Sequence, residues 1–451
     1  MNQLTKDLGA FIARTRLSDI PKEAFATIHF GLTDCVGTTL AGRYDPPPQI
    51  LKQVLDPVPG NATLLFEKST SRAPEAAWIN GTAAHALDYD DVGLRGHPST
   101  VIVPAILAEA EELGSSGADI ALAYAVGFEV WAALCNRDPD QHHNKGWHPT
   151  GIFGAIGAAA ACAKLHGLNA EQSAMAIALG ASQSAGIMAN FGTMTKPFHA
   201  GKSAHAGLMA ARLAKAGFTS SLDALEHTQG FLAAVSPNGR ADLTTPTNIG
   251  KEWALVTLGL SIKKYPLCFC THRALDGMLD LLARTPLKHD QIASIAVTTS
   301  RRNTRVLRNS RPKTGLEAKF SMQFAMASCV VGGRAGLNEL TDGFVMRPEV
   351  QALIEKVTVI PEDQEDPAKP GYAIRDLVEV VLKDGTKVDS GPITQVRGDA
   401  VNPLKPEELW TKFEDCAKAG KVTEFDIRAL FDTLMSIETV KHVRDIPGMG
   451  R

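Results

Sequence analysis

Apolar residues recur at every third or fourth position through most of the first 260 residues. In one such segment, Ile28, Leu32 and Val36 share a face before the pattern stops at Gly42, as expected of a helix packed on one side. The same period predicts further helices at 75–86, 99–113, 118–135, 151–165, 170–188 and 199–216. The proline-rich residues 45–48 are expected to interrupt this series.

The pattern changes after about residue 265. Alternating apolar residues predict four strands, at 292–300, 357–360, 377–382 and 386–390. The last two are expected to form a hairpin around Asp384–Gly385. Helical patterns lie between and after these strands, at 275–283, 320–331, 405–419 and 423–438.

These elements predict a mainly α protein of two domains. Residues 1–265 and 400–451 would form a large all-helical domain. Residues 266–399 would form a smaller α+β lid domain, inserted before the C-terminal helices. A chain of 451 residues is long enough to give each domain its own core.

Composition excludes several classes of protein. With 46 Lys and Arg against 49 Asp and Glu, the net charge of −3 gives no electrostatic reason to expect nucleic acid as a partner. The first residues lack the pattern of a secretory signal, and no uninterrupted apolar run reaches the length of a membrane span. Seven cysteines in apolar surroundings are typical of reduced thiols, so we expect a cytoplasmic protein.

The densest polar stretch is NGTAAHALDYDDVGLRGHPSTVIVP at 80–104. His85 and Asp88 would share a helix face, and a glycine-containing turn would then bring Arg95 and His97 to the start of the next helix. Carboxylates, a guanidinium and imidazoles at one turn suit proton transfer on an anionic substrate. A well-capped polar helix end explains this stretch equally well when it is taken alone.

Two further segments place ionisable groups beside predicted helices. In KGWHPT at 145–150, His148 directly precedes a helix, whose positive end lowers an imidazole pKa; a structural histidine is the simpler alternative. In NFGTMTKPFHAG at 190–201, Lys196 follows Thr193 and Thr195. This lysine could bind a carboxylate or act as a base, or it could be a solvated loop residue.

The segment KKYPLCFCTH at 263–272 lies at the predicted domain boundary. Cys268, Cys270 and His272 lack the second ligand pair of a zinc finger, so no metal site is expected. Lys263 and His272 are instead candidates for lining a small-molecule cleft. An arginine run at 301–311 is interpreted as a solvated face or an oligomer contact, and the absence of nucleotide and flavin motifs predicts no cofactor.

Five ordered motifs resemble the MmgE/PrpD family. They are HALDYDD with GHPS, then GWHPT, FGTMTKPFHAG, K-x-Y-P-x-C-x-x-TH, and EAKFS at 317–321. That family includes 2-methylcitrate dehydratase, cis-aconitate decarboxylase and iminodisuccinate epimerase. The resemblance covers nearly the whole chain. It implies a helical domain closed by the C-terminal helices, an α+β lid, a homodimer, and a cofactor-free site in the cleft between the domains.

The resemblance also assigns site residues. By motif, Asp88 is the first acid of D-Y-D-D, His97 is the histidine of H-P-S, and Lys263 belongs to K-x-Y-P. His148 and Lys196 come from G-W-H-P-T and T-M-T-K. Asp90 and Asp91 are expected to have structural roles.

The chain departs from the decarboxylase branch at two positions. Val92 stands where that branch has a threonine, and Phe324 is the aromatic residue where it has a hydroxyl-bearing one. Arg95 in R-G-H-P and the run T-M-T-K-P instead resemble the epimerase branch.

The predicted function is a cofactor-independent lyase of the dehydratase or decarboxylase type, acting on a small di- or tricarboxylate by proton transfer next to a carboxylate. His148 and Lys196 are the predicted proton-transfer pair, and Asp88 is expected to orient a histidine or a lysine. The predicted substrate-binding groups are Arg95, Lys263, His272 and Thr193, with His97 counted among the catalytic residues. The alternatives are an epimerase of an iminodisuccinate-like acid and a non-catalytic carboxylate-binding protein.

Overall fold

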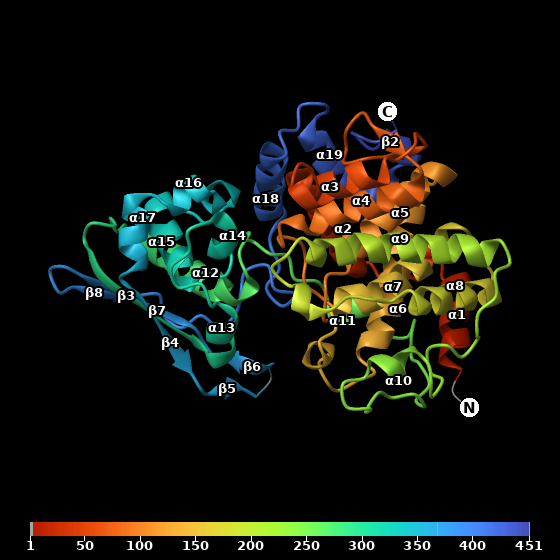
Figure 1. The fold of residues 1–451 in the computed structure, drawn as a ribbon, viewed down its shortest axis with the longest axis horizontal. Coiled ribbons are helices and arrows are strands. Elements are labelled where there is room, and N and C mark those ends of the chain that lie inside the picture. The colour runs from red at the N-terminus through yellow and green to blue at the C-terminus, as the bar shows by residue number, and fades with distance from the viewer. Residues whose placement is uncertain (1–2, 368, 451) are drawn as a thin grey trace. The chain divides into compact units, whose positions relative to one another are not determined.

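The computed structural model describes residues 3–367 and 369–450, which form two compact units (Figure 1). The first, called the helical unit below, takes in the chain up to Ile262 and again from Pro406. The second, called the sheet unit, is Lys263–Lys405. The protein is 54% helical with 10% strand, which confirms the prediction of a mainly α fold.

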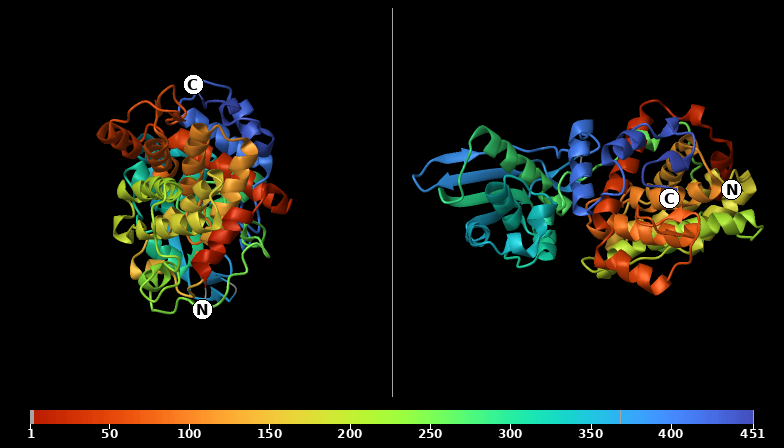
Figure 2. Two further views of the ribbon diagram at one scale, coloured as in Figure 1. Left: turned by 90° about the vertical axis from the view of Figure 1, so that its right-hand side faces the viewer. Right: turned by 90° about the horizontal axis from the view of Figure 1, so that it is seen from above.

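The helical unit consists of long helices separated by short turns. They are α1 (Leu4–Arg14), α2 (Ala24–Gly42), α3 (Pro46–Leu55), α4 (Ala73–Ala86), α5 (Ser99–Leu113), α6 (Gly117–Cys135), α7 (Pro149–Leu165), α8 (Ala170–Ser182), α9 (Thr195–Lys215), α18 (Pro406–Ala419) and α19 (Ile427–Leu434). Two short helices, α10 (Phe231–Val235) and α11 (Ala254–Thr257), and a two-stranded ribbon of β1 (Ala62–Thr63) and β2 (Thr70–Ser71) complete it. The late helix α18 packs beside α2 (Figures 1 and 2).

Glycines let the central helices of this unit approach closely. Helix α9 packs along α4 and α7. A Cβ added at Gly207 of α9 would lie 2.5 Å from the Ala158 Cβ and 2.6 Å from the Ala155 carbonyl oxygen of α7. One added at Gly201 would lie 2.2 Å from the Trp78 carbonyl oxygen of α4. Backbone therefore touches backbone, which side chains larger than hydrogen would prevent.

Helix α6 is long and apolar enough to cross a membrane by length and composition alone. Most of its apolar window, 78%, is buried inside the protein, where it contacts α7 and α5. Its surroundings are those of a core helix in a soluble protein.

The sheet unit is built on a four-stranded mixed sheet of order β4-β3-β7-β8. Its strands are β3 (Ile292–Ser300), β4 (Val357–Glu362), β7 (Leu377–Leu382) and β8 (Lys387–Asp389). β3 runs parallel to β4 and antiparallel to β7. Helices α12 (His272–Arg284), α15 (Met322–Gly332) and α17 (Pro348–Ile354) cover one face (Figure 1). Shorter elements surround them: α13 (Arg301–Val306), α14 (Gly315–Ala318), α16 (Asp342–Val345), β5 (Glu365–Asp366) and β6 (Lys369–Ala373).

Four predicted boundaries were wrong. Residues 45–48 do not interrupt the helices, because Pro46 begins α3, whose first turn needs no backbone N–H. Helix α8 ends at Ser182 rather than 188, and α19 spans only Ile427–Leu434. Helix α9 begins at Thr195 rather than 199, which places Lys196 in a helical first turn instead of a loop.

The contact of α9 with α7 predicts a stability change. Gly207→Ala should lower the free energy of unfolding by about 1–3 kcal/mol, because the new methyl group meets Ala155 and Ala158. Urea unfolding followed by tryptophan fluorescence reports the helical unit alone, since all five tryptophans lie in it. Lys215→Ala, at the exposed end of the same helix, should change stability by no more than about 0.5 kcal/mol. An unchanged or raised value for Gly207→Ala would contradict the close contact.

Candidate active site

Three helices of the helical unit begin at one place. Helix α5 starts just after His97, α7 just after His148, and α9 carries Lys196 in its first turn. The starts of α5 and α7 are joined directly, because the His97 backbone N–H donates to Thr150 Oγ1 at 3.2 Å. The end of α4 adds His85 to the same place. Helix N-termini carry partial positive charge, so their convergence favours an anion.

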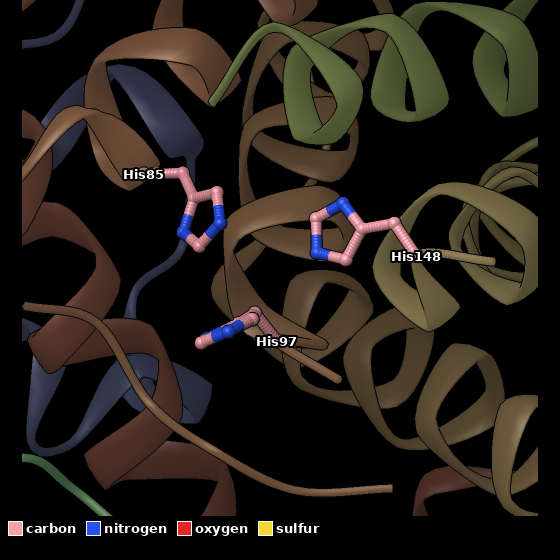
Figure 3. Close-up of side chains that lie close together, drawn as sticks. All are labelled: His85, His97 and His148. Atoms are coloured by element: carbon pink, nitrogen blue, oxygen red, sulfur yellow. The ribbon is translucent and has the colours of Figure 1, made fainter. Parts of the chain in front are cut away.

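A buried carboxylate joins two of the histidines. Asp90 is fully buried, and its Oδ1 lies 2.8 Å from His85 Nδ1 while its Oδ2 lies 2.8 Å from His97 Nδ1. His97 Nδ1 also lies 2.7 Å from the Asp91 carbonyl oxygen. The two ring centroids are 4.5 Å apart. Figure 3 shows these rings and that of His148 facing a common space.

The predicted acid and lysine form an ion pair. Lys196 Nζ donates to Asp88 Oδ1 at 2.7 Å and lies 5.2 Å from the Phe191 ring centroid. His97 Nε2 is 4.0 Å from the same carboxylate oxygen. Asp88 has φ of 53°, a left-handed conformation that costs free energy in a non-glycine residue and is often found at functional sites. The side chains of Asp88 and Lys196 are 23% and 13% exposed, so a ligand can reach them.

His148 is buried and caps the start of α7. Its Nδ1 lies 3.1 Å from His199 Nδ1 in the first turns of α9. Within the described residues, neither His148 Nε2 nor His85 Nε2 has a hydrogen-bond partner. These two buried nitrogens leave hydrogen-bonding capacity that a substrate could use.

Burial and the charge of Lys196 keep the imidazoles of His85 and His148 neutral. Burial lowers the pKa of His85 to about 4, and Lys196 and His97 add to this against the opposing effect of Asp90. Burial, Lys196 and the other histidines likewise hold the pKa of His148 well below its usual value. Neutral imidazoles accept protons, so the site pairs proton acceptors with one ammonium group.

The pKa values of the two neighbouring aspartates are shifted in opposite directions. Burial opposes ionisation of Asp90, but His85 and His97 outweigh it and hold its pKa well below the usual value. Burial and the adjacent Asp90 raise the pKa of Asp91 well above the usual value. Asp90 is therefore held as a carboxylate, whereas burial opposes the ionisation of Asp91.

The structure brings together Asp88, His97, His148 and Lys196 among the predicted site residues. Arg95 is turned by its φ of 66° toward the loop at 138–140, where it donates to the carbonyl oxygens of Asp138 at 2.8 Å and Asp140 at 2.6 Å.

Thr193 is exposed and donates to the Asn190 carbonyl oxygen at 2.8 Å. Lys263 and His272 are buried in the sheet unit, where His272 Nε2 lies 3.1 Å from the Leu267 carbonyl oxygen.

Three members of the cluster, His85, Asp90 and His199, are not among the predicted catalytic or substrate-binding residues, and Asp90 was expected to have a structural role. The spacing of five residues between His85 and Asp90 gave no signal, because neither a helix nor a strand aligns side chains at that interval. His199 could have been found from Lys196, since both lie in the first turns of one helix.

The cluster also bears on metal binding, for which the sequence predicts no site. His85, His97 and His148 each offer a ring nitrogen, and these atoms lie within 4.8 Å of one another. Zinc ligands in a tetrahedral site are about 3.3 Å apart, given Zn–N distances near 2.0–2.1 Å. Lys196 places a positive charge beside these rings, which disfavours a cation.

Comparison with known proteins supplies the family context. The sequence pattern of the MmgE/PrpD N-terminal domain matches residues 6–244, and that of the MmgE/PrpD C-terminal domain matches 265–429. The cis-aconitate decarboxylase of Homo sapiens is 29% identical over 383 residues, covering 81% of this chain and 77% of the relative. That of Mus musculus is 29% identical over 359 residues, covering 77% and 72%. The cis-aconitate decarboxylase of Aspergillus terreus is 24% identical over 472 residues, covering 98% and 94%. These relatives support an enzymatic function of the MmgE/PrpD type.

The buried neutral state of His85 predicts a pH dependence of stability. Its pKa is near 6.5 in an unfolded chain and about 4 here, so the unfolded state takes up the proton first as the pH falls. The stability that the neutral ring provides is complete above pH 6.5 and is lost between pH 6.5 and 4. At pH 5 this loss amounts to about 2 kcal/mol.

Urea unfolding of the wild type and His85→Gln at pH 7.5 and pH 5 measures this contribution. The variant should lose about 2 kcal/mol less than the wild type over that interval, while His227→Gln, at an exposed histidine, should behave as the wild type. Equal losses in all three proteins would show that His85 is not held neutral.

Proposed function

The chain belongs to the MmgE/PrpD family, and on that premise we propose that it is a cofactor-independent lyase acting on a small di- or tricarboxylic acid. The reaction is either removal of a proton from the carbon next to a carboxylate followed by loss of hydroxide, or loss of carbon dioxide followed by protonation of the carbon. The names of the relatives, all described as cis-aconitate decarboxylase or a similar protein, support the lyase class.

One observation carries the proposal: neutral imidazoles and one ammonium group meet at three helix N-termini. A carbon next to a carboxylate is a very weak acid in water, so an enzyme must stabilise the enolate-like charge that develops when its proton leaves. The helix ends and Lys196 supply positive potential for that charge. The unpartnered His148 Nε2 supplies a lone pair for the proton.

These positions suggest the roles of the residues. His148 and Lys196 form the proton-transfer pair, and Asp88 orients Lys196 through the 2.7 Å ion pair. His97, beside the same carboxylate, completes the catalytic group. Lys263, His272 and Thr193 remain predicted substrate contacts. To contact the substrate as well, Arg95 would have to break its hydrogen bonds to the backbone carbonyl oxygens of Asp138 and Asp140.

Two positions bear on which acid is the substrate. Val92 pairs by its backbone with Ser261, at 2.7 and 2.9 Å, and its side chain offers no hydroxyl. Phe324 is fully buried in the core of the sheet unit, 6.4 Å from the Phe344 ring, and also lacks one. Both differ from the decarboxylase branch, so dehydration of a hydroxy acid is favoured over decarboxylation of cis-aconitate.

The second candidate is an epimerase of an iminodisuccinate-like dicarboxylate. It is favoured by the run T-M-T-K-P, in which Lys196 and Pro197 open α9, and by Arg95 in R-G-H-P. The same enolate-like intermediate would then be reprotonated on its opposite face. We also propose the cytoplasm as the location, from the seven cysteines in apolar surroundings, and a homodimer as the assembly, from the family resemblance.

Proton NMR in D₂O separates these reactions. The protein is incubated with 2-methylcitrate, cis-aconitate and iminodisuccinate in turn. A new vinyl signal is expected for elimination or decarboxylation, whereas deuterium entry without loss of substrate would indicate the epimerase. Silence with all three acids would favour a non-catalytic carboxylate-binding protein and contradict the lyase proposal.

Removal of metal tests the cofactor-free chemistry. Dialysis against EDTA should leave the rate of the reacting acid unchanged, because Lys196 and the helix ends supply the positive charge. A loss of activity that zinc restores would instead assign the three histidines to a metal ion.

Substitution of the proton-transfer pair tests the roles of these residues. Lys196→Ala and His148→Ala should each lower turnover of the reacting acid by at least about a hundredfold, because each removes a group that moves the proton. Lys215→Ala and His227→Ala, at exposed positions, serve as matched controls and should keep near-normal rates. Circular dichroism checks that each variant is folded. Near-normal turnover in either of the first two variants would contradict the assignment.

A further inference from the structure

We propose that Asp90 is a positioning residue that fixes the protonated nitrogen of His85 by a hydrogen bond and supports that of His97 by its adjacent charge, so that each ring presents an unprotonated Nε2 to the substrate. The proposal rests on the proposed function for its catalytic meaning, while the geometry of the resting protein carries it. It gives Asp90 a different role from the structural one that the sequence predicts.

Hydrogen-bond chemistry fixes the proton positions. Asp90 Oδ1 lies 2.8 Å from His85 Nδ1, and a carboxylate can only accept, so His85 Nδ1 carries the hydrogen. His97 Nδ1 hydrogen-bonds to the Asp91 carbonyl oxygen at 2.7 Å, which can only accept, so this nitrogen also carries the hydrogen. Asp90 Oδ2 lies 2.8 Å from the same nitrogen and has no hydrogen-bond partner within the described residues, so it acts on His97 through its charge. In a neutral ring, the Nε2 atom then holds the lone pair.

The two lone pairs lie where a reaction can use them. His97 Nε2 is 4.0 Å from Asp88 Oδ1, the oxygen that Lys196 binds. His85 Nε2 is buried without a partner among the residues described, and its ring stacks 6.0 Å from that of His148 (Figure 3). Proton acceptors on three rings thus face the space beside the Lys196–Asp88 pair.

Asp90 also stabilises the imidazolium cation that forms when one of these rings is protonated. The C–H bond of the substrate breaks, its electron pair stays on the carbon as the enolate, and the proton bonds to Nε2 to give an imidazolium. The buried Asp90 carboxylate, 2.8 Å away on the far side of the ring, offsets that positive charge. The same carboxylate lies 2.8 Å from Nδ1 of both rings, so it can offset the charge of either imidazolium.

The neighbouring Asp91 provides a matched comparison. It is equally buried, but its side chain points to the start of α5, where the Ser99 backbone N–H donates to Asp91 Oδ2 at 3.3 Å. Only its backbone carbonyl contacts His97. An amide in place of Asp91 therefore preserves the histidine contacts, whereas an amide in place of Asp90 replaces one of its two acceptor oxygens by an N–H donor that faces one of the rings.

The test is nitrogen NMR of full-length protein labelled with ¹⁵N-histidine, with no substrate present. In the wild type, the signals lost in His85→Gln and in His97→Gln should both have the pattern of a ring protonated at Nδ1. Asp90→Asn should convert at least one of these rings to the Nε2-protonated form, and Asp91→Asn should leave both unchanged. An Nε2-protonated His97 in the wild type would overturn the proposal without any variant.

Kinetics complete the test. Asp90→Asn should lower turnover of the reacting acid by up to about 10⁴-fold, the loss known for an aspartate-to-asparagine change behind a catalytic histidine. Asp91→Asn should stay within about tenfold of the wild type. Equal losses in both variants, or unchanged tautomers in folded Asp90→Asn, would contradict the positioning role. If no acid reacts with the wild type while the tautomers are as expected, the proposed function fails and the positioning role stands.

Discussion

The contact between Gly81 of α4 and Gly201 of α9 is the constraint on which the site depends. A Cβ at Gly81 would lie 2.9 Å from the Gly201 Cα, so the two helix backbones meet at this point. His85 lies four residues after Gly81, and Lys196 five residues before Gly201. About one turn from the crossing, each helix therefore delivers an ionisable group to the same place. Larger residues at either glycine would separate these groups.

Close packing also explains the charge states. Helices that meet without intervening side chains exclude water, and exclusion of water keeps His85 and His148 neutral beside Lys196. The same burial would raise the pKa of Asp90, but the two neighbouring imidazoles lower it and keep the carboxyl group ionised. One fold feature thus yields neutral bases, a buried carboxylate and an ammonium group within a few ångströms. Proton transfer beside a carboxylate needs that combination.

Much of this arrangement could be predicted from the sequence, and the failures have physical causes. The helices follow from the apolar period, and β3 and β7 were predicted with their bounds. The start of α9 was missed because Pro197 suggested a loop, although proline fits the first turn of a helix. The motifs identified Asp88, His97, His148 and Lys196. They could not identify Asp90, because its partners are set by the turn after α4 and not by a helical or strand period.

The central claim is that the groups around Lys196 form a polycarboxylate site whose imidazoles are neutral before binding. Isothermal titration calorimetry with propane-1,2,3-tricarboxylate, in two buffers of different ionisation enthalpy, tests it most directly. Binding should be accompanied by proton uptake, because a bound carboxylate raises the pKa of nearby histidines. Lys196→Ala should bind at least about tenfold more weakly, since a charge-assisted hydrogen bond is lost. Absence of binding, or equal affinity in the wild type and Lys196→Ala, would contradict it.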